Sequence, residues 1–261
     1  MRSGKCQPTN GRRYALRLRT LVSIADPPAH GISLERALLH GGFAGMTGKS
    51  SKLLTCGIVL APLFYVVVGG QMVTRSGFDI TRHPLSLLAL GDAGWIQVAN
   101  FLVAGSLAVA CGFGIHATLA GAAGGTWGSL LIATYGIGMI VAGISPADPI
   151  PGFPPGFVSA IPPPLSRHAI GHGLGFLLAF ASLIAACFVF ARRFRQRGDR
   201  GWARYSMATG GMTLLLLALG MAVKPAASLS FFVVGIFAFS WIGALAAKIS
   251  HDARYDTHTR T

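Results

Sequence analysis

The sequence predicts an all-α fold, a polytopic membrane bundle of about six transmembrane helices. Of the 261 residues, 52% are hydrophobic and only 11% are charged, whereas a soluble domain carries about 25% charged residues. Six stretches are long and apolar enough for a spanning helix, which needs about 20 residues. The alternating pattern of a membrane β-barrel is missing, and helices then remain the structure that satisfies backbone groups in lipid.

Each of the six expected spans is free of Asp, Glu, Lys and Arg. The spans are expected at residues 53–73, 95–119, 127–145, 169–191, 205–223 and 229–247.

The basic residues predict the orientation, because Lys and Arg collect on the cytoplasmic side of a membrane. Nine of them precede the first span, six lie between the fourth and fifth, and three follow the sixth, against four in the remaining connections. This asymmetry and the even number of spans predict a multi-pass plasma-membrane protein with both termini cytoplasmic.

We expect three segments along the chain. Residues 1–52 form a basic, mobile cytoplasmic tail, residues 53–247 the transmembrane domain and residues 248–261 a cytoplasmic C-terminal tail. The net charge of +14 is interpreted as a topology signal rather than as a nucleic-acid site, and membrane lipids are the expected partners.

The first non-cytoplasmic loop gathers charged residues that are scarce elsewhere. We expect a short apolar helix beginning at Pro84, since proline suits the first turn of a helix. Asp92 precedes the second span and is expected to cap it. Asp79 is expected to form an ion pair with Arg75 or Arg82, and a functional role of this group is the alternative.

The second non-cytoplasmic loop, residues 146–164, is rich in proline and is hypothesised to act as a lid over the helix ends. At its two ends lie Asp148 and the pair His168 and His172, whose i, i+4 spacing places both rings on one helix face. The three side chains are interpreted as a hydrogen-bonded polar cluster, with a zinc site as the alternative.

Gln97 and Asn100 lie three residues apart on one face of the second span. They are expected to hydrogen-bond to neighbouring helices, or else to line a cavity open to the outside. The candidate polar cluster of the non-cytoplasmic face is then Asp79, Arg82, His83, Ser86, Asp92, Gln97, Asn100, Asp148, His168 and His172.

Several motifs resemble a known family. They are the first loop and second span, Phe78-Asp79 with Arg82-His83-Pro84-Leu85-Ser86, Leu90-Gly91-Asp92 and Gly94-Trp95-Ile96-Gln97, together with Pro146-Ala147-Asp148-Pro149 and the histidine-led fourth span. They resemble the prokaryotic multi-pass membrane family catalogued as domain of unknown function 998, over about residues 53–247. The resemblance implies a multi-helix membrane protein and no established activity.

A more distant similarity links Ser86, Asp148, His168 and His172 in type to a superfamily of membrane hydrolases that includes alkaline ceramidases and progestin/adiponectin-type receptors. Those proteins have seven spans and carry the histidine pair in the last one, so the similarity is an analogy.

Three functions follow from these residues. The first is a non-enzymatic membrane protein that is structural or binds a partner or lipid. The alternative is a zinc-dependent hydrolase acting on a lipid at the outer leaflet. A transporter is the least favoured, because the inner halves of the spans carry few polar residues.

Overall fold

The computed structural model describes residues 29–158 and 164–258, and these residues form a helical structure. The chain divides into two units, Met1–Gly45 and Met46–Thr261. In the first unit, the described residues belong to a helix that continues into the second. The second unit contains the membrane bundle.

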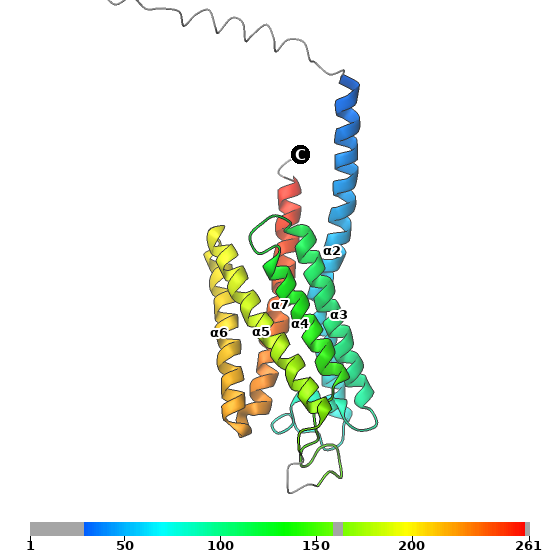
Figure 1. Ribbon diagram of the computed structural model, residues 1–261, viewed down its shortest axis with the longest axis vertical. Coiled ribbons are helices and arrows are strands. Elements are labelled where there is room, and N and C mark those ends of the chain that lie inside the picture. The colour runs from blue at the N-terminus through cyan, green and yellow to red at the C-terminus, as the bar shows by residue number, and fades with distance from the viewer. Residues whose placement is uncertain (1–28, 159–163, 259–261) are drawn as a thin grey trace, which may run out of the picture. The chain divides into compact units, whose positions relative to one another are not determined.

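The bundle contains long helices and two short 3₁₀ turns (Figure 1). In chain order they are α2 (Ala29–Thr74), η1 (Leu85–Ala89), α3 (Gly94–Thr118), α4 (Trp127–Ile144), α5 (Arg167–Gln196), α6 (Arg200–Ala222), η2 (Lys224–Ala226) and α7 (Ala227–His258). Within the described part of the chain, six helices have the length and composition to cross a membrane. The predicted fold class is therefore confirmed, and each predicted span corresponds to one of these helices.

The helices extend beyond the predicted spans at several ends. α2 begins at Ala29, so residues 29–52 of the predicted tail are helical, while residues 1–28 lie outside the described part. α5 continues to Gln196 through the basic run, and α7 continues to His258. Charged residues at the ends of a span sustain a helix as well as apolar ones do, and only Gly and Pro oppose it strongly.

Helices that follow one another in the chain pack against one another, from α3 to α7. Close approach at glycine explains the tight pairing of α4 with its neighbours. A Cβ on Gly138 would lie 2.6 Å from the backbone of Gly175 and Ala179 on α5, and one on Gly136 would lie 2.4 Å from the carbonyl of Gly105 on α3. Small residues drive helix association in lipid in this way, because they let backbones come into contact.

The long connections α2–α3 and α4–α5 gather at one end of the bundle, which we call the loop end (Figure 1). The predicted short helix after Pro84 is confirmed as η1, whose Leu87 and Leu88 are buried. Ser228 at the start of α7 donates a hydrogen bond of 2.6 Å to the carbonyl of Ile80. The first loop is therefore attached to α7 as well as to the helices that it connects.

Two predictions about this loop are wrong. Asp92 is exposed and does not cap α3, because the helix begins one residue later, after Ala93, and lacks a side-chain cap. Asp79 forms none of the ion pairs found among the described residues. Its Oδ1 instead accepts hydrogen bonds from the backbone and hydroxyl of Thr81, at 2.9 and 2.7 Å.

Candidate functional site

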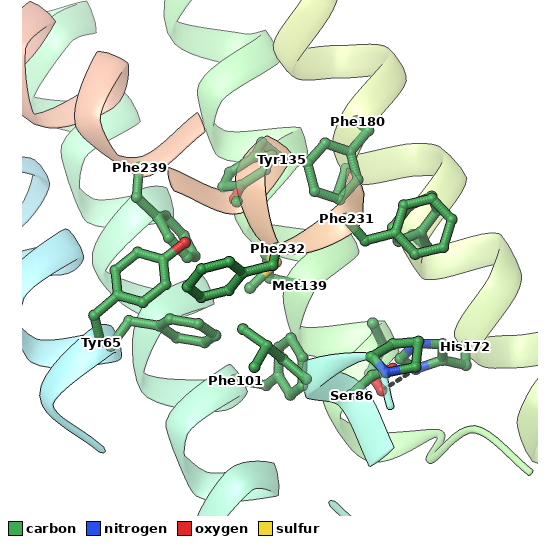
Figure 2. Close-up of a pocket in the computed structure, with 17 residues that line it drawn as sticks. Tyr65, Ser86, Phe101, Tyr135, Met139, His172, Phe180, Phe231, Phe232 and Phe239 are labelled. Atoms are coloured by element: carbon green, nitrogen blue, oxygen red, sulfur yellow. Dashed lines mark hydrogen bonds between the residues drawn. The ribbon is translucent and has the colours of Figure 1, made fainter. Parts of the chain in front are cut away.

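An aromatic cavity of about 90 Å³ lies within the bundle and reaches the loop end. It is lined by residues of α2, η1, α3, α4, α5 and α7, and Figure 2 shows the labelled side chains around it. We call this space the aromatic cavity. Its lining comprises Phe64, Tyr65, Pro84, Leu85, Ser86, Phe101, Tyr135, Met139, Ala142, His172, Phe176, Ala179, Phe180, Phe231, Phe232, Gly235 and Phe239.

Helical periodicity explains how these side chains come to face one space. Residues four apart lie on one helix face, and three of the spans carry such rows toward the cavity. The rows are Tyr135 and Met139 on α4, His172, Phe176 and Phe180 on α5, and Phe231, Gly235 and Phe239 on α7. Bulky rings that meet across a bundle leave gaps, and an apolar gap stays dry and can take up an apolar molecule.

The rings form a continuous network along the walls. Phe64 contacts both Phe101 and Phe239, with centroid distances of 5.8 and 4.7 Å, and Phe176 contacts Phe180 and Phe231 at 4.7 and 5.3 Å. Tilted and edge-to-face pairs at these distances are favourable. Phe176 and Phe231 are only partly buried, so the cavity has a rim at the surface of the bundle, between α5 and α7.

Two tyrosine hydroxyls in this apolar wall have no hydrogen-bond partner among the residues that the structure describes. They belong to Tyr65 on α2 and to Tyr135 on α4, whose side chain is fully buried. A buried hydroxyl without a partner costs about 1–3 kcal/mol. The two hydroxyls are therefore the most exceptional polar groups of the cavity.

The loop end of the cavity is more polar. Ser86 of η1 and His172 of α5 both line it and lie next to each other in the view of Figure 2. The Nδ1 atom of His172 lies 2.9 Å from the carbonyl of Ala142 and 3.1 Å from that of Ser145. The ring therefore donates from Nδ1 to the last turn of α4, which fixes its position at the edge of the cavity.

The two loops dock on each other through Phe153. This ring is 0% exposed and contacts Phe78 and His83, with centroid distances of 5.4 and 5.5 Å. The guanidinium of Arg75 lies 5.5 Å from the centre of the same ring and donates to the carbonyls of Leu88 and Leu90 at the end of η1. We call this arrangement the loop cap. It holds in place the η1 segment that closes the loop end of the cavity.

His83 occupies the centre of the loop cap and is 2% exposed. The backbone N–H of Asp79 donates to its Nδ1 at 3.0 Å, which requires the neutral ring with its proton on Nε2. Burial lowers the pKa of His83 below its usual value, and the positive charge of Arg82 lowers it further. The hydrogen bonds from Thr81 lower the pKa of the Asp79 carboxyl, so this group is ionised at neutral pH.

Asp148 braces the beginning of α5. Its Oδ2 accepts a hydrogen bond of 2.9 Å from the backbone of Ser166, whose own hydroxyl caps the helix by accepting from Ala169. Hydrogen bonding by the side chain and the backbone of Ser166 lowers the pKa of Asp148. His168 is exposed, and its charge lowers the pKa of Asp148 further, whereas His172 contacts the last turn of α4.

The predicted zinc donors are not assembled. Among the described residues, which include all three candidates, no group of three His, Cys, Asp or Glu side chains is placed to hold a metal ion. The reason is visible in the contacts, because Asp148 faces the Ser166 backbone and His172 faces the end of α4. The geometry thus gives the zinc alternative no support.

Gln97 and Asn100 form hydrogen bonds between helices, which confirms the first of the two interpretations. Gln97 Oε1 accepts from Gln71 on α2 at 2.8 Å and from Asn100 at 3.3 Å, and Asn100 also donates to the carbonyl of Phe64. All three amide side chains are buried. The network joins α2 to α3 beside the aromatic cavity, and neither Gln97 nor Asn100 lines that cavity.

The candidate residues thus separate into small groups rather than one site. Asp79 and His83 belong to the loop cap, Gln97 and Asn100 to the amide network, and Ser86 and His172 to the cavity. The side chains of Arg82, Asp92 and His168 are exposed.

Sequence reasoning missed Gln71, Tyr65, Tyr135 and the aromatic rows. The available signal was the spacing of four between rings in the fourth span and of eight between Phe231 and Phe239 in the sixth, together with tyrosines inside apolar runs. Polar groups at such positions are uncommon in lipid and are worth attention.

Comparison with known proteins supports the architecture. A family model described as "Protein of unknown function (DUF998)" matches residues 58–248, which confirms the resemblance seen in the loop and span motifs. No curated protein and no solved structure matches the chain significantly. The matched range includes five of the six spanning helices in full or nearly so and every residue of the aromatic cavity. The chain is an integral membrane protein and belongs to this family of proteins of unknown function, DUF998.

Proposed function

We propose that this protein binds an apolar molecule dissolved in the membrane, taking it into the aromatic cavity from the lipid. The cavity itself is the observation that supports this proposal. It lies within the span of the helices, its walls are aromatic, and its rim includes the partly buried rings Phe176 and Phe231. A site of this kind gains free energy from every methylene group that it buries, about 0.8 kcal/mol each.

The volume of the cavity limits how much of the ligand can be enclosed by protein. An engineered cavity of about 150 Å³ in another protein takes up benzene, and the aromatic cavity measures about 90 Å³. It therefore encloses a few methylene groups or, with small movements of the rim, one ring. The remainder of the ligand lies against the rim and in the lipid.

We also propose the cellular setting. The protein lies in the plasma membrane with both termini in the cytoplasm, so that the loop cap faces outward. The distribution of 22 Lys and Arg residues supports this orientation. Reporter fusions at residue 261 and in the connection at Lys224 would test it, because a cytoplasmic reporter should be active only at the first site.

The binding proposal is tested with a decyl chain that carries a photoactivatable diazirine. The purified protein in phosphatidylcholine nanodiscs is labelled, and the labelled residues are identified by mass spectrometry. We expect adducts on Met139 and Phe176. Adducts confined to lipid-facing residues such as Leu177 would contradict the proposal.

A matched pair of variants makes the test specific. Ala142→Phe places a ring in the cavity and should reduce labelling there several-fold, whereas Ile137→Phe adds the same ring on the lipid-facing side of α4, where Ile137 is 48% exposed, and should leave it unchanged. Overpacking costs about 1–3 kcal/mol, so thermal stability is measured in parallel. If Ala142→Phe fails to fold, Gly235→Leu serves instead, because its added atoms meet the hydroxyl end of Tyr65.

A further inference from the structure

The two tyrosine hydroxyls of the aromatic cavity indicate which chemical group the ligand carries. Tyr135 is 0% exposed, and its hydroxyl and that of Tyr65 have no partner within the described structure. A plain hydrocarbon chain would fill the cavity and still leave both hydroxyls without a hydrogen bond. A ligand with a hydrogen-bond acceptor next to the two hydroxyls would satisfy them and would therefore bind more tightly than a hydrocarbon.

The two tyrosines lie at the same depth. Tyr65 precedes the end of α2 at Thr74 by nine residues, and Tyr135 precedes the end of α4 at Ile144 by nine. At about 1.5 Å per residue, both are roughly 14 Å from the loop end of their helices, close to the middle of a hydrocarbon core about 30 Å thick. Water is scarce at this depth, so a ligand atom is the natural partner for both hydroxyls.

The hydroxyls also converge. Both rings contact Phe239, with centroid distances of 5.8 Å from Tyr65 and 6.2 Å from Tyr135. Figure 2 shows the two side chains on either side of Phe239, with their hydroxyl ends directed toward the cavity. The two hydroxyls therefore face the same region of the cavity, beside Phe239 (Figure 2).

The lining favours a neutral acceptor. None of the residues that line the cavity is Asp, Glu, Lys or Arg, and a charged ligand would be costly so deep in the bilayer. A carbonyl oxygen has two lone pairs and accepts from both phenols. An alcohol that accepts from both phenols would still carry an O–H of its own, which would need another acceptor.

We propose that the ligand is a membrane-soluble ring ketone of the quinone type, whose carbonyl oxygen accepts hydrogen bonds from Tyr65 and Tyr135. The flat ring lies among Phe232, Phe239 and Met139, where offset and edge-to-face contacts favour it. Its apolar chain leaves through the rim between α5 and α7. This assignment rests on the proposed binding of an apolar molecule and adds its polar group.

The test compares two probes that have the same alkyl groups on a six-membered ring. One is 2-decyl-3,5,6-trimethyl-1,4-benzoquinone, which lacks a free ring position for addition to cysteine. The other is the decylbenzene that carries the same three methyl groups, 1-decyl-2,4,5-trimethylbenzene, which is called decylbenzene below. Competition of each with the diazirine probe gives the affinities in nanodiscs. We expect the wild-type protein to bind the quinone about 10-fold more tightly than decylbenzene, which corresponds to two hydrogen bonds at their usual net strength.

Tyr135→Phe removes one oxygen and keeps the ring, so it should reduce the affinity for the quinone about 3-fold or more and leave decylbenzene binding unchanged. Tyr65→Phe should act in the same direction. Tyr205→Phe, on a partly exposed tyrosine of α6 outside the cavity, should change neither affinity. Thermal unfolding of each variant verifies that it is folded.

The outcomes distinguish the two proposals. If decylbenzene binds and the quinone has no advantage, or if its advantage persists in both Tyr→Phe variants, the ring-ketone assignment is overturned while apolar binding stands. Water alone then satisfies the hydroxyls. If the diazirine probe labels the cavity and neither ring probe competes with it, the ring-ketone assignment is again overturned. If the diazirine probe leaves Met139 and Phe176 unlabelled, the proposed function itself fails.

Discussion

Replacement of Phe153 by Ala should open the loop cap. The ring is 0% exposed and contacts Phe78, His83 and Arg75. Truncation of a buried Phe to Ala costs about 3–5 kcal/mol. Because a loop relaxes more readily than a helical core, we take about 3 kcal/mol, which corresponds to a roughly 150-fold larger open population of the cap.

Hydrogen exchange measures this population, since local opening sets the exchange rate of protected amides. The amides of His83 and Gly152 donate to Asp79 and Phe157 within the two loops, so their exchange should accelerate roughly 150-fold in Phe153→Ala. Amides in the middle of α5 should be unaffected. Val158→Ala is the matched control, because Val158 lies in the same loop and is 93% exposed. Exchange of His83 within twofold of the wild type would refute the idea that Phe153 holds the loops together.

Three further changes probe other parts of the structure. The pKa of His83 is lower in the folded cap than its usual 6.5, so the unfolded state binds more protons at acidic pH. The stability contributed by the neutral ring should therefore be full above about pH 6.5 and fall below it. Thermal unfolding between pH 5 and 8 that shows no such fall, or the same fall in His83→Gln, would contradict this. Gln97→Ala leaves the buried amide of Gln71 without its partner and should lower the free energy of unfolding by about 1–3 kcal/mol, and an unchanged denaturation midpoint would count against it. Gly138→Leu should separate α4 from α5 and lower thermal stability markedly, whereas Gly69→Leu, with open space around its Cβ position, should be close to neutral; equal effects would contradict the packing described.

The fold class was predictable because the lengths of the apolar stretches determine which segments cross the membrane as helices. A stretch such as residues 169–191 has no charged residue and exceeds the thickness of a bilayer, so its helical state in the membrane follows from backbone hydrogen bonding alone. The helix ends were harder to predict. α5 continues through the basic residues that follow its apolar part, because arginine has about the same helix propensity as leucine.

Local contacts in the loops were predictable only in part. Proximity in the sequence suggested that Asp79 pairs with Arg75 or Arg82. In the structure the carboxylate is satisfied by Thr81 two residues away, and Arg75 donates instead to the free carbonyls at the end of η1. Short side-chain-to-backbone hydrogen bonds compete with ion pairs, and exposed ion pairs contribute little.

The cavity was beyond sequence reasoning because it depends on how the spans face one another. The rings of Phe176 and Phe231 are ordinary apolar residues in their own helices, and they become walls of one space only when α5 and α7 are placed together. In the same way, Tyr135 has the sequence context of a core residue, and only the structure shows that its hydroxyl has no partner within the described part of the chain.

Binding of an apolar membrane ligand in the aromatic cavity can be observed in a density map. The map would be of the protein in nanodiscs prepared from native membranes, with an antibody fragment bound to increase the particle size. We expect density of a ligand that extends from the hydroxyls of Tyr65 and Tyr135 past Phe232 to the rim. A map in which the side chains around Phe239 close the space, with no density between them, would contradict it.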